Sequence, residues 1–511
     1  MSSHPEALLG IDVGTTNVKA ALFLPNGSLH AVNTQRLPVI RPQPGWEEYD
    51  PEELFAHTAK TVKTLLADLK EPIHIAGVAV ASMAETAVAL DKQGQALHHA
   101  VAWHDQRSLP QAQWWRQSFG AEAVYTITGL PPAYIFGVNK LMWLRENAPE
   151  AFAKTVCWLN VADYIAYRLC GVQATDYSLA SRLMLLDLRQ GTWSDVMLEA
   201  CGLSADLFAP LVKSGSYLGG VHAEAAAATG LAQGTAVVSG GHDHPCGAFA
   251  LGITRPGDVL DSMGTSESIF SIVEAPKLEA SLAQTGYQQG FHVVADSYYV
   301  NGGLYTSGRC IEWLKDLLEP KTDDPYAELI RLASAAPAAS RGLMFLPHLR
   351  MANTPIDDPH SRGAFIGLSI GSTRECMARA LFEGLAYEAQ VALDGLAELF
   401  DIRAKRVRAI GGGSRNPLLM VIKATLLGEA IDVFAMDEAT SLGAAMLAGL
   451  GAGVYSSVDE AIETVRVPAS QVAPDAVLQE TYKQRYQKVY QKLYYQLKPL
   501  YHQLASLEED V

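Results

Sequence analysis

The stretch that decides the fold is LLGIDVGTTNVKAALFLPNG, residues 8–27. It holds two apolar runs, residues 8–13 and 18–24, on either side of a small polar turn, Gly-Thr-Thr. Pro-Asn-Gly at residues 25–27 is a typical hairpin turn and sends the chain back into SLHAVNT. We therefore expect three strands joined by two short turns at the start of the chain.

Helical and strand patterns alternate after this opening. Pro51 at a first helical position, with Glu52 and Glu53 in the first turn, predicts a helix over residues 51–69. The apolar run HIAGVAVAS at residues 74–82 predicts a buried strand. This alternation indicates an α/β architecture.

The opening pattern returns halfway along the chain, in GDVLDSMGTSESIFSIVE at residues 257–274. SMGTS near residue 264 and DVGTT near residue 14 lie between similar apolar runs. Chance is one explanation, because Gly-Thr pairs are common. We favour two related lobes, each with one hairpin that presents backbone N–H groups and hydroxyls. LGITRPG, at residues 251–257, fits a connector between them.

Composition limits the classes of function. The 511 residues are 49% apolar and 18% charged, which is typical of a globular chain of several domains. A net charge of −16 repels a phosphate backbone and argues against a nucleic-acid partner. Six dispersed cysteines and no apolar leader predict reduced thiols and a cytoplasmic location. Residues 439–458 are too weakly hydrophobic for a membrane span and predict a packed core helix followed by a turn.

A long helical pattern covers residues 478–507, with tyrosines at 482, 486, 490 and 494. Spacing of four residues places these rings on one face of a helix. We favour packing of this aromatic stripe onto the second lobe. An oligomer contact, and with it a homodimer, is the alternative.

The first turn carries groups that suit phosphate binding. Gly14, Thr15 and Thr16 offer amides and hydroxyls, Lys19 adds a positive charge, and Asp12 can hold Mg²⁺ directly or through water. An ordinary hairpin with a surface lysine is the alternative. The GxxxxGK[ST] pattern is absent, so this is not a P-loop.

A carboxylate follows the apolar strand TAVVSG, in Gly241-His242-Asp243-His244. We expect the strand to run into a turn there, with Asp243 at the lip of an α/β cleft. In that place Asp243 can accept a proton from a hydroxyl nucleophile. A metal site at the His-x-His pair has little support, because alternate residues of an extended strand point to opposite faces. A turn or capping aspartate is the remaining alternative.

Two further segments complete the set. Gly264-Thr265-Ser266 predicts a clamp on the β- or γ-phosphate, or a plain hairpin. Gly411, Gly412 and Gly413 let a flat ring lie against the backbone, and Asn416-Pro417 then starts a helix. The small residues of 438–445 suit a helix packed closely on a sheet or a nucleotide.

Together these motifs resemble the FGGY carbohydrate kinases, within the actin/hexokinase/Hsp70 ATPase superfamily. The matching motifs are DxGTT…K, GxxD at 240–243, GTS, GGGSRNP at 411–417 and ExxxLGAA at 438–445, supported by Trp103-His-Asp105-Gln-Arg107, Thr175-Asp176-Tyr177-Ser178 and Arg362-Gly363. The resemblance implies two RNase-H-like lobes with an interlobe cleft, binding a sugar and ATP with Mg²⁺. The expected domains are residues 1–253 for the sugar lobe, 254–455 for the nucleotide lobe, and 456–511 for a helical extension on the second lobe.

The resemblance also implies residue roles. Asp243 is the expected general base, and Asp12 and Asp243 are the expected Mg²⁺-associated carboxylates. The expected sugar contacts are Glu85, Trp103, Asp105, Arg107, Tyr134, Asp243 and His244. The expected ATP and phosphate contacts are Gly14, Thr15, Thr16, Lys19, Gly264, Thr265, Ser266, Gly308, Gly411, Gly412, Gly413 and Asn416.

The substrate is left open. Ala84 stands where glycerol kinases carry arginine, which argues against glycerol, while the Gln-Met-His-Gly of xylulose kinases is also absent. The run Gly-His-Asp at residues 241–243, and Glu267 after the GTS turn, are similar to the corresponding residues of fuculose kinases. A superfamily ATPase without kinase activity is disfavoured by Trp103, Asp105 and Arg107. A non-catalytic sugar sensor is disfavoured by the intact Asp12, Asp243 and both Gly-Thr turns.

Overall fold

The opening strands lie in a six-stranded sheet of the first lobe. The computed structural model describes residues 5–509. Its first sheet has the order β13 (Tyr217–Gly220), β14 (Ala236–His242), β5 (His74–Ser82), β1 (Glu6–Val13), β2 (Asn17–Phe23) and β3 (Leu29–Arg36). β1, β2 and β3 pair antiparallel, while β5 and β14 run parallel to β1. The predicted strands at the start of the chain and at 74–82 are confirmed.

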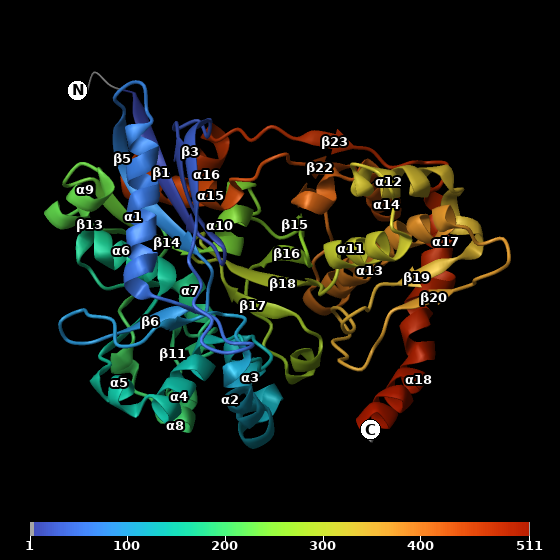
Figure 1. Cartoon of the computed structure of the whole chain (residues 1–511), viewed down its shortest axis with the longest axis horizontal. Helices are drawn as coiled ribbons and strands as arrows, with labels where there is room; N and C mark the ends of the chain where they lie inside the picture. The colour runs from blue at the N-terminus through green and yellow to red at the C-terminus, as the bar shows by residue number, and fades with distance from the viewer. Residues whose placement is uncertain (1–4, 510–511) are drawn as a thin grey trace.

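The second sheet repeats this arrangement in the other lobe (Figure 1). Its order is β17 (Gln288–Phe291), β18 (Tyr298–Leu304), β16 (Glu267–Val273), β15 (Asp258–Met263), β21 (Arg406–Ile410), β22 (Ile431–Val433) and β23 (Ser470–Val472). β15, β16 and β18 pair antiparallel, and β21 and β22 run parallel to β15. The two Gly-Thr turns therefore occupy the same place in two lobes of the same topology, as predicted.

Helices cover both faces of the first sheet. α1 (Pro51–Ala67) begins at the predicted proline, where the Asp50 carboxylate accepts the Glu52 N–H at 2.8 Å and caps the helix. α1 and α6 (Val161–Cys170) pack on one face. α10 (Asp243–Ala250) and α15 (Ala439–Gly451) pack on the other face. The alternation of Leu8 and Leu9 between the two faces follows from the period of a strand.

α15 is the packed helix that the sequence predicts, but it lies on the first sheet although it comes late in the chain. A Cβ atom added to Gly10 of β1 would lie 1.8 Å from the Ser441 carbonyl oxygen, so this contact requires glycine. α16 (Val458–Thr464) also contributes to the core on this side of the first sheet. We expected α15 in the second lobe and α16 in an extension on that lobe. The domain bounds themselves stay a prediction.

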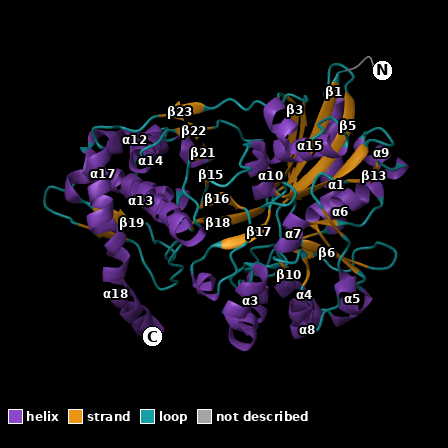
Figure 2. Cartoon of the chain, turned by 180° about the vertical axis from the view of Figure 1, so that it is seen from behind, coloured by secondary structure: helices purple, strands orange, loops and turns teal. Residues whose placement is uncertain are grey.

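The C-terminal helix packs beside α13 (Arg374–Phe400) of the second lobe and lies far from α1 (Figures 1 and 2). It is built from α17 (Gln479–Arg485), a π-helical turn (Tyr486–Tyr490) and α18 (Gln491–Glu509). The four predicted tyrosines are buried, so their packing onto the second lobe is confirmed. Their hydroxyls also donate to carboxylates, including Tyr490 to Glu388 at 2.7 Å and Tyr494 to Asp358 at 2.7 Å.

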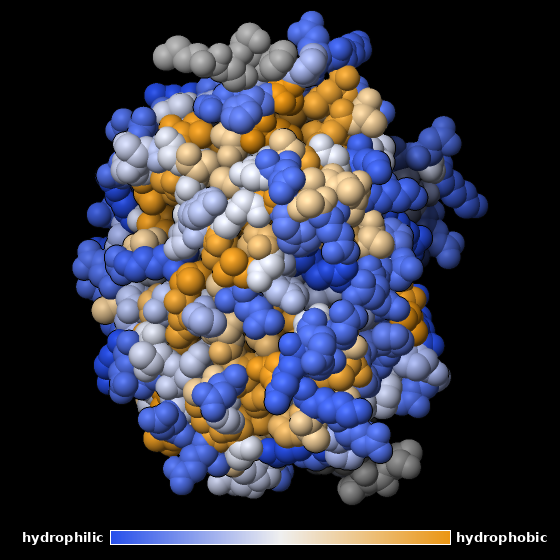
Figure 3. All heavy atoms as spheres, turned by 90° about the vertical axis from the view of Figure 1, so that its left-hand side faces the viewer, coloured by the Kyte–Doolittle hydropathy of each residue, from blue (hydrophilic) through white to orange (hydrophobic). Residues whose placement is uncertain are grey.

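Hydrophilic and hydrophobic side chains are interspersed on the outer face of the first lobe (Figure 3). Across residues 5–509, no helix combines the length and the hydropathy needed to cross a bilayer.

Candidate active site

A cavity of about 310 Å³ lies between the lobes. Its first-lobe lining includes Thr15, Met83, Ala84, Glu85, Trp103, Ile135, Arg182, His242, Asp243 and His244, and its second-lobe lining is Phe270, Tyr299 and Asn301. Four predicted sugar contacts, Glu85, Trp103, Asp243 and His244, thus meet at one cavity. The residues of the second lobe were not predicted, because β16 and β18 reach the cavity only when the lobes are assembled.

Asp243 is the first residue of α10 and follows β14 directly, so the predicted turn at this point is wrong. His244 is therefore helical, and the argument from strand alternation does not apply to the His-x-His pair. The Asp243 Oδ1 atom accepts the His244 N–H at 2.6 Å and lies 3.1 Å from His242 Nε2. Burial acts to raise the pKa of Asp243, but the bond and charge of His242 and the contacts with His244 lower it to about 2. The carboxylate is ionised at neutral pH and can accept a proton.

Glu85 is paired with an arginine that sequence reasoning missed. Arg182 Nε donates to Glu85 Oε1 at 2.6 Å, and Arg182 Nη1 donates to Gln288 of the second lobe at 2.7 Å. Glu85 has a φ of +64°, which a non-glycine residue adopts only under constraint from its surroundings. The cavity therefore contains a cation although residue 84 is alanine, because Arg182 supplies one from a distant segment.

Asp105 and Arg107 do not line the cavity in this structure. Arg107 Nη2 bonds Asp105 Oδ2 at 2.8 Å, the guanidinium also contacts Glu48, and the side chains of Asp105 and Arg107 are 0% exposed. The Tyr134 side chain is likewise not part of the lining. These residues brace the loop that carries Trp103, so their predicted contact with sugar stays a prediction.

A buried lysine, Lys140, fastens the same loop. Its Nζ atom donates to the carbonyls of Trp103 at 3.1 Å, Tyr134 at 3.0 Å and Ile135 at 2.7 Å. Burial lowers the pKa of Lys140 to about 7. The sequence signal for it is weak, because a lysine inside a helical pattern usually faces solvent.

Two buried polar atoms of the cavity residues have no hydrogen-bond partner among residues 5–509: the Tyr299 hydroxyl and His242 Nδ1. Buried polar groups are almost always paired in folded proteins. Each atom has almost no solvent-accessible surface, so neither is open to a ligand in the cavity.

The first Gly-Thr turn forms the edge of the same site. Gly14 N–H donates to the Asn17 carbonyl at 3.0 Å, and the Thr15 hydroxyl accepts the Trp103 indole N–H at 3.0 Å. Lys19 Nζ donates to the Asp437 carbonyl at 2.7 Å and pairs with Glu438 at 3.4 Å, next to the start of α15. The predicted phosphate contacts of Thr15, Thr16 and Lys19 stay predictions.

Asp12 is the penultimate residue of β1, beside this turn. Burial, and then the charge of Asp243, raise the pKa of Asp12 to about 7, while Lys19 acts in the opposite direction. Two neighbouring carboxylates of this kind fit a divalent cation, because Mg²⁺ takes one or two protein carboxylates and completes its shell with water and phosphate oxygens. Among residues 5–509, no group of three or more His, Cys, Asp or Glu is placed to hold a metal by itself.

A larger cavity of about 600 Å³ lies in the second lobe. Six predicted nucleotide contacts line it: Gly264, Thr265, Gly308, Gly412, Gly413 and Asn416. Gly411 and Ser266 are not part of the lining and support the turns instead. Gly411 has a φ of +97°, and the Ser266 carbonyl accepts the Gly264 N–H at 2.8 Å. Ile311, Ile330 and Phe382 add an apolar wall that the motifs did not indicate.

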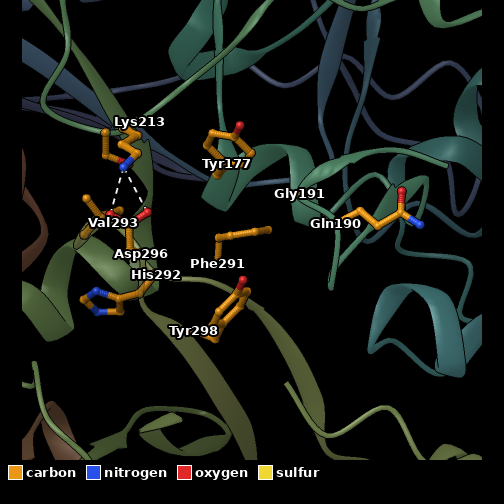
Figure 4. A pocket seen from close by; sticks show the side chains of 11 residues that line it. Tyr177, Gln190, Gly191, Lys213, Phe291, His292, Val293, Asp296 and Tyr298 are labelled. Carbon is orange, nitrogen blue, oxygen red and sulfur yellow. Dashed lines mark hydrogen bonds and ion pairs between the residues drawn. The ribbon is translucent and has the colours of Figure 1, made fainter. Parts of the chain in front are cut away.

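A third cavity, of about 210 Å³, lies where the β17–β18 turn meets α7 (Tyr177–Ser181) (Figure 4). Its carboxylate, Asp296, is paired with Lys213 of the first lobe at 2.8 Å. The carboxylate of this cavity is therefore engaged in an ion pair between the lobes.

Two lobes of the same topology, each with a Gly-Thr turn, and a strand-end carboxylate in the cleft define a kinase of the actin-like ATPase fold. The chain belongs to the FGGY family of carbohydrate kinases: residues 7–250 match the N-terminal domain of the family and residues 260–452 match the C-terminal domain. It is an ATP-dependent phosphotransferase that acts on a hydroxyl of a small sugar or polyol.

Similar proteins include several kinases of this family. The chain is 31% identical to a xylulose kinase of Bacillus subtilis over 93% of this chain and 94% of the relative. It is 29% identical to a glycerol kinase of Thermococcus onnurineus over 89% and 90%. The crystal structure of xylulose kinase from Rhodospirillum rubrum matches with a TM-score of 0.89 and 29% identity, covering 97% of this chain and all of that one.

Proposed function

We propose that the substrate is a ketose or polyol of four to six carbons, and that Asp243 is the general base. The observation that carries the proposal is the joint presence, in one cavity, of the Glu85–Arg182 pair and Asn301 with Asp243. A carboxylate, a guanidinium and an amide can pair with several hydroxyls, and Trp103 supplies an apolar wall. The similarity to xylulose kinases supports a pentulose within this class.

In the proposed mechanism, Glu85 and Arg182 orient the sugar and Asp243 accepts the proton of the attacking hydroxyl as the γ-phosphoryl transfers in line. The turns at Gly14–Thr16 and Gly264–Ser266 direct amides and hydroxyls at the phosphoryl oxygens. Closure of the lobes excludes water and limits hydrolysis of ATP. Asp12 and Asp243 are the residues that would hold Mg²⁺, which neutralises charge on the phosphates when bound.

Glycerol should be a poor substrate. A three-carbon polyol leaves some of the Glu85, Arg182 and Asn301 groups without a partner, and a missing hydrogen bond in a closed site strongly lowers kcat/KM for that substrate. Adding a second arginine through Ala84→Arg should crowd the Glu85–Arg182 pair rather than create a glycerol site.

The test measures ADP release with pentuloses, hexuloses, tetritols and glycerol, and compares Arg182→Lys with the parent. A loss of bidentate bonding should raise KM for the best ketose by about 10–100-fold with little change in KM for ATP. Arg189→Lys, at an exposed position in the following turn, is the matched control and should behave like the parent. Equal or better turnover of glycerol by the parent would contradict the substrate class but not the kinase activity.

We also propose a cytoplasmic location and a homodimer. All six cysteines are free in the described chain, which supports a reducing compartment. On α18, Leu500 and Leu504 are 55% exposed and Leu507 is 64% exposed, which supports a contact between two chains. Sedimentation of the parent and of Leu504→Glu tests the dimer.

A further inference from the structure

A cavity of about 430 Å³ lies at the junction of the two lobes, away from the residues of the kinase site. It is lined by Leu251 and Gly252 of the interlobe connector, by β21 of the second sheet, and by the segment that follows α16 on the first lobe. Part of its wall is apolar, through Phe434, Met446 and Ile462. The volume lies within the range of pockets that bind small molecules.

Three arginines line this cavity: Arg406, Arg408 and Arg466. Arg406 is bound to Asp258 at 2.8 Å. The Arg408 Nε atom is buried and has no hydrogen-bond partner among residues 5–509. Arg466 is exposed at the cavity, and its main chain is fixed by an N–H bond to the Asn26 carbonyl at 3.1 Å. Glu463 is the acidic residue of the lining and is exposed.

An arginine with an unpaired buried N–H is unusual, because a guanidinium inside a protein normally satisfies its donors. A Cβ atom at Gly252 would lie 2.5 Å from Arg408 Nη1, so the guanidinium lies directly against the connector. Burial, and then the charge of Arg406, lower the pKa of Arg408, while Asp258 and Asp432 act in the opposite direction. An anion in the cavity offers the Arg408 guanidinium a partner.

We propose that this cavity binds a phosphorylated small molecule, with its phosphate held by Arg408 and Arg466 and its organic part against the apolar wall. The planar fork of arginine matches phosphate geometry, and the cavity is larger than a phosphate ion alone requires. A purely structural role for Arg408, neutralising the carbonyls at the end of α10, is the competing explanation.

The site touches elements that lead to both ligands of the kinase. α10 begins at Asp243 and ends at the cavity, about 12 Å away at 1.5 Å per residue. β21 passes the cavity and continues into Gly411, Gly412 and Gly413. A phosphate compound bound at this site should therefore also alter the affinity of the kinase for ADP.

The experiment titrates the full chain, saturated with ADP, Mg²⁺ and the best ketose so that the kinase cavities are filled, with ribose 5-phosphate and separately with inorganic phosphate, by calorimetry at constant ionic strength. Arg408→Met should weaken binding of the phosphate compound at least tenfold, and Arg466→Met about threefold or more. Arg255→Met changes an arginine that is 77% exposed outside the lining, and it should bind like the parent. Because neither Arg408 nor Arg466 contacts the kinase cavities, turnover without added anion should stay within twofold of the parent.

The two probes separate the sources of the ligand. Tighter binding of ribose 5-phosphate identifies a sugar phosphate, and equal binding identifies free phosphate. Equal affinity in the parent and Arg466→Met, a variant at an exposed position, would overturn the site even if Arg408→Met failed to fold. Failure of both probes to bind at millimolar concentration would also overturn it.

Discussion

Asp12 and Asp243 are two neighbouring carboxyl groups with very different pKa values. Contacts with His242 and His244 lower the pKa of Asp243 to about 2, while burial and the charge of Asp243 raise that of Asp12 to about 7. Such separation is typical of catalytic sites, where each group needs its own protonation state.

The Asp12 shift predicts a pH-dependent stability. Its native pKa lies above the value of 3.8 for an unperturbed aspartate, so the native state binds more protons and loses stability as pH rises from about 4 to 7. Asp12→Asn should therefore raise the free energy of unfolding at pH 8 without Mg²⁺ by about 1–3 kcal/mol, and the gain should shrink toward pH 4. Urea unfolding across this range is the measurement.

Asp323→Asn, at an exposed position, is the control for that series and should show no such trend. A destabilised Asp12→Asn variant at pH 8 would show that Asp12 is stabilised as a carboxylate by groups other than a cation.

Single residues also show how far the sequence leads. Asp243 could be found because it follows a recognisable strand, and Glu85 was placed in the site by resemblance. Arg182 could not, since it lies 97 residues from its partner Glu85 and belongs to no motif. Asp105 and Arg107 were placed in the sugar site by resemblance, but their pairing with each other and with Glu48 depends on tertiary packing.

At the scale of elements, the glycine turn after β21 gives a clear prediction. No atom lies within 4 Å of a Cβ added to Gly412, yet Gly412 lines the cavity of about 600 Å³. Gly412→Val should therefore fold like the parent and weaken ADP binding by about tenfold or more, because the side chain enters the cavity. Calorimetry measures the affinity for ADP and, as the control, the affinity for the best ketose. An unchanged ADP affinity would show that this turn is not part of the nucleotide site.

The C-terminal helix gives a second prediction at this scale. The Tyr490 hydroxyl donates to the buried Glu388 carboxylate at 2.7 Å, so Tyr490→Phe should cost about 1.5–3 kcal/mol of stability. Tyr495→Phe, at a residue 61% exposed, should change stability by less than about 0.5 kcal/mol. Chemical denaturation compares the two; similar values would mean that this hydroxyl does not anchor the helix.

The sequence predicted this helix through the spacing of its tyrosines, and the hairpins through their turns. It did not predict the π-helical turn at Tyr486–Tyr490 or the acidic partners on α13, Asp394 and Glu388. Those features depend on which surface the helix meets, and local pattern carries no information about that surface.

At the scale of the whole molecule, the duplicated topology explains why two similar turns lie 250 residues apart in one chain. The hairpin repeat was visible in the sequence because turns have strong local signatures. The position of α15 could not be predicted from the sequence, because small residues show that a helix packs closely but not which sheet it packs on. Contacts from both lobes, such as Arg182 with Gln288 at 2.7 Å, complete the interlobe cavity only in the assembled molecule.

The most direct test of the account is sugar-dependent ADP release by the parent and by Asp243→Asn, with ATP binding measured alongside. We predict that the parent phosphorylates a ketose and that the variant loses about 10²–10⁴ in rate while it still binds ATP. Turnover by Asp243→Asn within a few-fold of the parent would contradict the assignment of Asp243 as the general base.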